Sequence, residues 1–348
     1  MKKHLLILLS FTALVLSGCA QDPKPIEFVR ELPQQAFPET VVAGNYSGIT
    51  HVKGNQYAIA NDKSPQSGFY FFYIDIDSIS GEITSVRMDS LLTNGQPNRD
   101  EEAIAYVPSS NTLFVAGEAD HRIVEYNLDG SLTGRELNIP EIYKTARRNL
   151  SFEALAYNAK TQKFWTSSEG PLPCDGEVAS SKNHIQNKIR IQSFNKDLQP
   201  DKQYAYLMDV PVARDTVTTN SQTGLSSIIA LDDGRLIVLE RELFFVKEYF
   251  GSYFNEKIYV VNPKKGTPIT SETQLTDETP YLEKEFLFEW RTDVSVLSYE
   301  LANYEAMCLG PRLANGDQTI LMVCDSQNQY LGLLKDWFKV LIVRGLYN

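Results

Sequence analysis

The chain has 348 residues, of which 43% are hydrophobic, 11% aromatic and 22% charged, and this composition excludes disordered, collagen-like and coiled-coil proteins. Its 44 acidic residues outnumber 33 lysines and arginines, giving a formal net charge of -11. That balance argues against electrostatic binding to nucleic acid or anionic lipid, and it favours cationic partners such as metal ions. Four cysteines, none in a C-x-x-C pair, cannot form a disulfide framework in so long a chain.

Residues 1–25 are predicted to lie outside the folded domain. Lys2-Lys3 precedes an apolar run over residues 5–16, which is shorter than the roughly 20 helical residues that span a bilayer. With the small residues before Cys19, residues 1–18 resemble a bacterial lipoprotein signal peptide, and the resemblance implies cleavage before Cys19 and lipid attachment to its sulfur. Residues 19–25 would be a tether, since two prolines argue against the alternative of a short buried helix. We therefore expect a protein held at the cell envelope by its lipid anchor alone, on the periplasmic or surface face of an outer membrane.

An internal repeat indicates the architecture of the remaining chain. In each unit, a polar, a small and an aliphatic residue are followed by a turn and by a β-rich strand that ends in a charge. The paired segments are 47–49 with 57–62, 102–104 with 113–118, 153–155 with 164–169, 226–228 with 236–241, and 305–307 with 320–325. Hairpin dipeptides such as Gly54-Asn55 and Asp233-Gly234 join the two segments, and one or two further strands follow each pair. Four antiparallel strands per repeated unit predict an all-β protein, a β-propeller.

The number of blades is predicted as five to six. Five units are visible, but their spacing in the second half of the chain exceeds the roughly 40–50 residues of a compact blade, which leaves room for a sixth. Residues 26–32 look like a strand without a partner, and the last unit is one strand short before Asn348. Pairing of these two ends would close the ring and remove both exposed sheet edges. Residues 26–348 are thus expected to form one domain, and we expect a monomer.

The repeated charges are expected to gather around the central channel, because the innermost strands of a propeller and the loops beside them face it. The first column of the repeat contributes Glu102, Glu153 and Glu305, and the second contributes Asp62, Glu118, Glu169 and Asp325, with Arg241 in the fourth unit. Seven carboxylates in one funnel repel one another unless protons, a basic residue or a bound cation compensate. Oxygen ligands in that number suit Ca²⁺ or Mg²⁺ better than zinc. The alternative for each acid is a structural role, in which it caps a strand end within its own blade.

The cysteines leave two possibilities open. Cys308 and Cys324 could face each other across the hairpin at Asn315-Gly316 and form a disulfide in an oxidising compartment, or both could be buried thiols. Cys174 has no partner in either case.

Several motifs carry a family resemblance. They are Asn303-Tyr304-Glu305-Ala306-Met307, Leu309-Gly310-Pro311-Arg312-Leu313, Val323-Cys324-Asp325, Leu239-Glu240-Arg241 and Phe152-Glu153-Ala154-Leu155-Ala156. Together they resemble the phytase-like family of bacterial exported proteins, also described as esterase-like activity of phytase, over nearly all of residues 40–330. The resemblance implies a phytase-like propeller with phosphoester or ester hydrolase activity. The R-H-G motif of histidine acid phytases is absent, and Glu-Ala replaces the family's common Glu-Gly in three units.

Two functions from different classes follow. The first is a metal-dependent hydrolase of a small anionic ester or phosphoester. In it, Asp62, Glu118, Glu169 and Asp325 would contribute Ca²⁺ ligands, Arg241 would clamp substrate oxygens, and one of Glu102, Glu153 and Glu305 would take a proton from the attacking water. The second is a non-catalytic propeller that binds a ligand or protein at the envelope through long loops at 170–225 and 262–300. The sequence has no G-x-S-x-G, P-loop, H-E-x-x-H or G-x-G-x-x-G motif, which excludes an α/β-hydrolase, and fold alone favours neither function.

Overall fold

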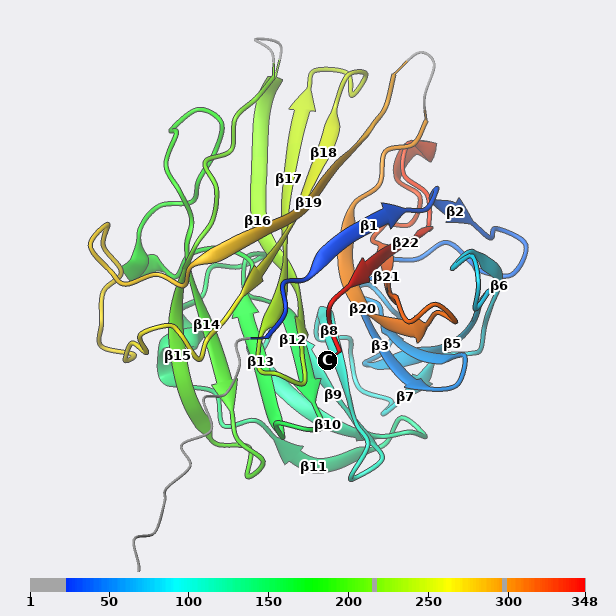
Figure 1. Ribbon diagram of the computed structural model, residues 1–348, viewed down its shortest axis with the longest axis horizontal. Helices are drawn as coiled ribbons and strands as arrows, with labels where there is room; N and C mark the ends of the chain where they lie inside the picture. Colours follow the sequence, from blue (N-terminus) through cyan, green and yellow to red (C-terminus); the bar gives the residue numbers. More distant parts are fainter. Residues whose placement is uncertain (1–22, 215–217, 296–298, 348) are drawn as a thin grey trace, which may run out of the picture.

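Five antiparallel sheets surround a central axis in the computed structural model, which describes residues 23–214, 218–295 and 299–347 (Figure 1). Each sheet contains a path of four hydrogen-bonded strands, and two sheets carry one short additional strand. The predicted all-β propeller is confirmed, and it has five blades. The helices in the described ranges are three short 3-10 turns, namely η1 (Glu141–Thr145), η2 (Pro173–Asp175) and η3 (Tyr330–Gly332). None of the helices in this part of the chain is long and apolar enough to cross a membrane.

The blades follow one another along the chain, each beginning with its innermost strand. Blade 1 contains β3 (Gly48–Lys53), β4 (Gln56–Ala60), β5 (Gly68–Ile76) and β6 (Ile83–Met88), with β7 (Leu92–Thr93) paired to β5. Blade 2 contains β8 (Glu101–Val107), β9 (Thr112–Gly117), β10 (Arg122–Asn127) and β11 (Leu132–Glu136). Blade 3 contains β12 (Phe152–Asn158), β13 (Lys163–Ser168), β14 (Lys188–Phe194) and β15 (Pro200–Leu207). Blade 4 contains β16 (Thr218–Ala230), β17 (Leu236–Val246), β18 (Tyr253–Val261) and β19 (Lys284–Asp293).

Blade 5 is built from both ends of the described chain. It contains β20 (Tyr304–Arg312), β21 (Gln318–Cys324), β22 (Trp337–Arg344) and, as its outermost strand, β1 (Glu27–Glu31); β2 (Gln35–Ala36) also pairs with β22. β1 runs antiparallel to β22, with Glu27 opposite Arg344. The ring of Phe28 stacks on Phe288 of blade 4, with ring centroids 3.8 Å apart. The predicted closure by pairing of the two terminal strands is therefore confirmed.

The wide gaps of the repeat are filled by extensions of blades 3 and 4, so the predicted range of five to six blades resolves to five. The innermost strand β16 has 13 residues, whereas the innermost strands of the other blades have six to nine. Its partner β17 has 11 residues. Two long connections pack on blade 3, namely residues 169–187 between β13 and β14 and residues 262–283 between β18 and β19. The buried guanidinium of Arg190 binds both connections. It donates to Asp175 Oδ2 at 2.6 Å and to the carbonyl of Thr270 at 3.2 Å.

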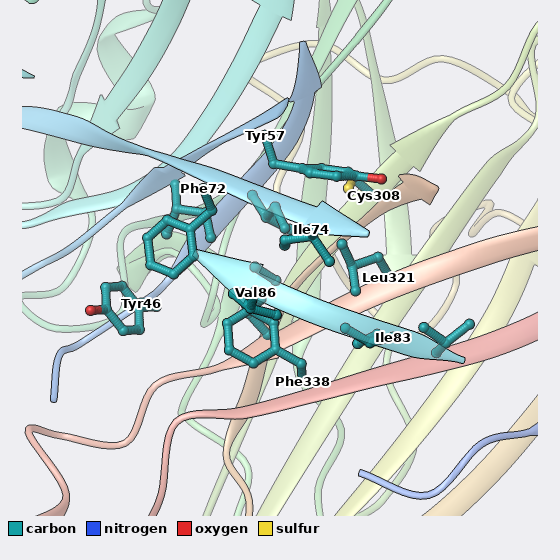
Figure 2. Close-up of a cluster of buried hydrophobic side chains, with 14 of the residues drawn as sticks. Tyr46, Tyr57, Phe72, Ile74, Ile83, Val86, Cys308, Leu321 and Phe338 are labelled. Atoms are coloured by element: carbon teal, nitrogen blue, oxygen red, sulfur yellow. The ribbon is translucent and has the colours of Figure 1, made fainter. Parts of the chain in front are cut away.

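Hydrophobic cores lie between neighbouring blades. The largest is shared by blades 1 and 5, with Tyr57 and Phe72 on one side and Leu321 and Phe338 on the other (Figure 2). Closer to the axis there is little room. A Cβ on Gly48 would lie 2.8 Å from the carbonyl oxygen of Glu102 on the next inner strand. This crowding explains why the second position of each repeat is a small residue.

Cys308 and Cys324 are separate buried thiols. In the β20–β21 ladder, Cys308 lies opposite Leu321 and Cys324 lies opposite Tyr304, so the two do not face each other. Of the two possibilities left open by the sequence, the structure has the second. The thiol of Cys324 instead donates to the carbonyl of Lys335 at 2.8 Å.

Candidate functional site in the central channel

The first column of the repeat lies at irregularities in the innermost strands. Pairing skips one residue in β8, β12, β16 and β20, and the skipped residues are Glu102, Glu153, Ser226 and Glu305 respectively. A bulge removes a residue from the hydrogen-bonded ladder and redirects its side chain. The polar first position of the repeat is thus the bulge residue in four of the five blades.

The second column is fixed by one recurring backbone hydrogen bond. In each case the acidic residue that follows the second strand donates its N–H to a carbonyl just before, or at the start of, the first strand of the same blade. The pairs are Asp62 with Asn45 at 3.1 Å, Glu118 with Asp100 at 2.8 Å, Glu169 with Ser151 at 2.7 Å, and Asp325 with Asn303 at 2.9 Å. Blade 4 differs because its hairpin continues, so that Arg241 remains within β17 and pairs with Gly224.

Both columns line one pocket of about 440 Å³ at one end of the channel. All eight residues singled out in the sequence take part, namely Asp62, Glu102, Glu118, Glu153, Glu169, Arg241, Glu305 and Asp325. Each is less than a tenth exposed. The structure therefore brings the predicted residues together, while their division into catalytic groups and metal ligands stays a prediction.

Arg241 neutralises two of the carboxyl groups. Its guanidinium donates to Glu169 from the neighbouring blade 3 and to Glu305 from blade 5, and Nη1 also donates to Asn303 Oδ1 at 2.6 Å. Asn303 in turn donates to Glu305 Oε1 at 2.8 Å. Burial raises the pKa of Glu169 and of Glu305, and the positive charge of Arg241 opposes that rise.

The carboxyl groups beyond the reach of Arg241 are poorly compensated. Burial, followed by repulsion from neighbouring carboxylates, raises the pKa of Glu102 and Glu153 well above the usual range. The same two causes raise the pKa of Asp325 well above normal. Within the described structure, Glu153 Oε2 and Asp62 Oδ1 are buried and have no hydrogen-bond partner. Buried carboxylate oxygens without partners are costly, so a proton or a bound cation is needed to balance them.

Two further residues form a second charged group at the edge of the pocket, on the side of blades 1 and 2. The ammonium of Lys63 lies 2.8 Å from Asp62 Oδ2 and also contacts Asp100. Burial raises the pKa of Asp62 to about 6, although Lys63 opposes the rise. Asp62, Asp100 and Glu102 each offer an oxygen within 4.8 Å of the others, which is a spacing that suits a metal ion.

Sequence reasoning missed Asp100, Lys63, Asn303 and a buried acid behind Arg241. Glu256 of β18 lies directly opposite Arg241 and is fully buried, and its Oε1 accepts the N–H of Tyr304 at 3.3 Å. Burial raises its pKa well above the usual range. No repeat position marks Glu256, so the alignment of units could not find it. Asn303 had a signal, because it stands two residues before Glu305 in the most specific motif.

The opposite end of the inner strands is different in character. A second pocket, of about 370 Å³, is lined by aliphatic residues such as Ile104, Leu155 and Ile229 together with polar residues such as His51 and Asp232. Ile104 and Leu155 come two residues after Glu102 and Glu153 on their strands. The carboxyl groups of the repeat are thus concentrated at one mouth of the channel.

Fold and pocket together define a β-propeller with an acidic, oxygen-lined pocket on its axis. The chain belongs to the Phytase-like family, described as esterase-like activity of phytase, whose family model matches residues 42–327. The resemblance noted in the sequence is therefore confirmed. No curated protein matches this sequence.

Solved structures match this chain at low similarity. A levansucrase complexed with sucrose is 11% identical, with a TM-score of 0.42 over 86% of this chain and 81% of that chain. A member of the DUF4221 family from Bacteroides vulgatus is 10% identical, with a TM-score of 0.39 over 92% and 99% of the two chains. A protein of unknown function from Bacteroides thetaiotaomicron is 9% identical, with a TM-score of 0.37 over 86% and 70%. At this distance none of them bears on function.

Proposed function

We propose that this protein hydrolyses ester or phosphoester bonds in the acidic pocket, with a divalent cation, Ca²⁺, bound among the carboxylates. The observation that carries the proposal is the convergence of seven carboxyl groups and Arg241 on one pocket, where two buried carboxylate oxygens have no described partner. Membership of the Phytase-like family supports the same reaction class.

The residues of the pocket fit a hard cation. Carboxylate oxygens are the ligands that Ca²⁺ prefers, and Asp62, Asp100 and Glu102 have the spacing to hold one ion. Lys63 occupies Asp62 Oδ2 but leaves Oδ1 free for a ligand role. When bound, Ca²⁺ would supply positive charge next to the reacting carbonyl or phosphoryl group.

The chain's own residues would orient substrate and move the proton. Glu153 is the best placed acceptor for a proton from water, because the residue lines the pocket and its buried Oε2 has no described partner. Arg241 holds Glu169 and Glu305 in position, and both hydrogens of its Nη1 are engaged by Glu305 and Asn303. Nη2 donates to Glu169, so the role of Arg241 would be to fix these carboxylates around the substrate.

The test is calcium binding by calorimetry, followed by hydrolysis assays on the same samples. Wild type is compared with Glu153→Gln and Glu305→Gln, and with Glu285→Gln on the exposed edge of blade 4 as a matched control. Titration in two buffers of different protonation enthalpy should show that Ca²⁺ releases protons from the raised-pKa carboxyl groups. Calcium binding by wild type, with turnover of phosphomonoesters or short-chain esters that vanishes in the pocket variants and survives in the control, supports the proposal. Turnover that persists in both pocket variants contradicts it.

A second candidate, a propeller that binds a ligand without turnover, is favoured by one observation. Both cations of the pocket lining, Lys63 and Arg241, are already paired with carboxylates in the described structure. A pocket of this kind can take up a cation without activating a substrate. Calcium binding with no hydrolysis of either ester class would select this candidate.

We also propose that the protein is exported and anchored by a lipid on Cys19, which, with the signal segment 1–18, lies outside the described residues. The support is the resemblance of the segment to a lipoprotein signal peptide. Cys19→Ser should move the protein from the membrane fraction to the soluble fraction of the envelope. An unchanged membrane fraction would contradict the proposal.

A further inference from the structure

The pocket has one wall that differs chemically from the rest. β16 and β17 of blade 4 are long strands that extend together at this end of the channel, and β18 pairs with β17 as far as Phe244 (Figure 1). Arg241, Leu243 and Phe245 alternate along β17 and all line the pocket, and Gln222 lies opposite Leu243 on β16. Since alternate residues of a strand point to the same face, the wall changes from charged at its base to apolar above. Leu243 and Phe245 are the only large apolar residues among the described lining residues of the pocket.

This apolar wall, defined as Leu243 and Phe245, is supported from behind. Phe244, on the other face of β17, stacks on Tyr253 with ring centroids 4.7 Å apart. Leu243 packs against a buried cluster formed by Phe254, Val294, Leu301 and Leu334. In the turn between β17 and β18, the hydroxyl of Tyr249 lies 3.0 Å from that of Tyr330 in blade 5. The wall is therefore part of the packed structure, and it is half-buried before any ligand binds.

The charges of the pocket limit what can lie against this wall. Seven carboxyl groups face two cations among its described lining residues, and both cations are engaged by carboxylates. A ligand that carries several phosphates would meet few free donors and many like charges. A ligand with one charged or polar head and one apolar group would satisfy both parts of the pocket.

We infer that the substrate is a monoester whose apolar group, an aryl or alkyl chain, packs on Leu243 and Phe245, and that polyphosphorylated ligands are excluded. The inference rests on the proposed function for its ester head group and adds the class of the remaining substrate. Leu243 and Phe245 are specificity-determining residues in this scheme.

The experiment compares benzylphosphonate with methylphosphonate, two non-hydrolysable probes of equal charge, by calorimetry in the presence of Ca²⁺. Burial of the aryl group on the wall should make benzylphosphonate bind about tenfold more tightly. Phe245→Ala, and more fully the double variant with Leu243→Ala, should abolish that preference and leave methylphosphonate affinity unchanged. Phe286→Ala, a matched control at an exposed position of β19, should retain it. Inositol hexakisphosphate, the polyanionic probe, should bind more weakly than either phosphonate.

The outcomes separate this inference from the proposed function. Equal affinity for the two phosphonates, absence of binding by both, a preference that survives in the double variant, or tight binding of inositol hexakisphosphate would each overturn the inference. Thermal melts of every variant show whether a loss reflects unfolding. If the preference is present and no ester is hydrolysed, the hydrolase proposal fails while the binding inference stands. If esters are hydrolysed without an aryl preference, the binding inference fails while the hydrolase proposal stands.

Discussion

Gly224 lies against the side chain of Glu169, so closely that a Cβ on Gly224 would be 2.2 Å from Cγ and 2.6 Å from Oε1 of that glutamate. The two residues belong to neighbouring blades, and Gly224 is also the strand partner of Arg241. The backbone of blade 4 thus leaves the space in which Glu169 reaches Arg241. The position tolerates no side chain, although no unusual backbone conformation requires glycine there.

Gly224→Ala should therefore displace Glu169 and weaken its ion pair with Arg241. We expect a loss of about 1–3 kcal/mol in the free energy of unfolding, as for other overpacked sites, measured by urea denaturation. Calcium affinity should fall as well. Gly170→Ala is the matched control, because its nearest neighbours are the flexible side-chain atoms of Leu150 at 3.2 Å. Equal stability of the two variants would contradict the role assigned to Gly224.

Arg241→Gln should be among the most destabilising substitutions in the chain. It leaves Glu169, Glu305 and the buried Glu256 without their counter-charge, and removing one partner of a buried ion pair costs about 3–5 kcal/mol. Arg122→Gln breaks a pair with Glu136 in which both side chains are about half exposed, and it should cost less than about 1 kcal/mol. Urea denaturation at pH 7 compares the two. A loss from Arg241→Gln no larger than that of the control would show that the buried acids are neutralised without it.

The metal-free protein should lose stability as the pH rises from about 5 to 7.5. Burial raises the pKa of Asp62 to about 6 and of Glu118 to about 7, whereas unfolded carboxyl groups titrate near 4. The folded state then binds more protons than the unfolded state, so the stability from these groups is complete below pH 4 and is lost through pH 6 and 7.

Melting temperatures across this pH range check the prediction. Glu118→Gln should flatten the slope, because its amide does not titrate, and added Ca²⁺ should restore stability at pH 7.5 by replacing the protons. A melting temperature of the metal-free protein that rises steadily between pH 5 and 7.5 would contradict the assigned pKa shifts.

Phe28→Ala should weaken the closure of the ring. Phe28 on β1 stacks on Phe288 of blade 4, so its loss removes a contact that joins the closing strand to a second blade. A partly buried aromatic pair contributes about 1–2 kcal/mol through burial and ring geometry. The neighbouring Val29 is exposed, and Val29→Ala should change stability by less than about 0.5 kcal/mol. Limited proteolysis, with cleavage near β1, would detect the opened edge, and equal protease resistance of both variants would refute the prediction.

The sequence predicted the propeller and the location of its acidic residues because both depend on local, repeated features. The second segment of every repeat unit ends in a charged residue, and the fold places these equivalent residues at the same end of the channel. The blade count was left at five to six because strand length has no clear signal: β16 and β17 simply continue past the repeat. Glu256 and Lys63 could not be predicted, since their importance comes from cross-strand and inter-blade contacts and not from any repeat position. The choice between disulfide and free thiols likewise depended on register, which places Cys308 opposite Leu321.

Blade 5 has a consequence for how the molecule is made. Its outer strand β1 precedes every other strand that the structure describes, and the partner β22 comes after all of them. During folding, β1 therefore remains unpaired until β22 is available, while blades 1 to 4 can form in sequence. Ring formation is the last event, and a chain cut short before β22 would expose the edges of both β1 and β21 to other polypeptides. Nascent or truncated molecules, more than the finished propeller, should be the form that needs chaperones.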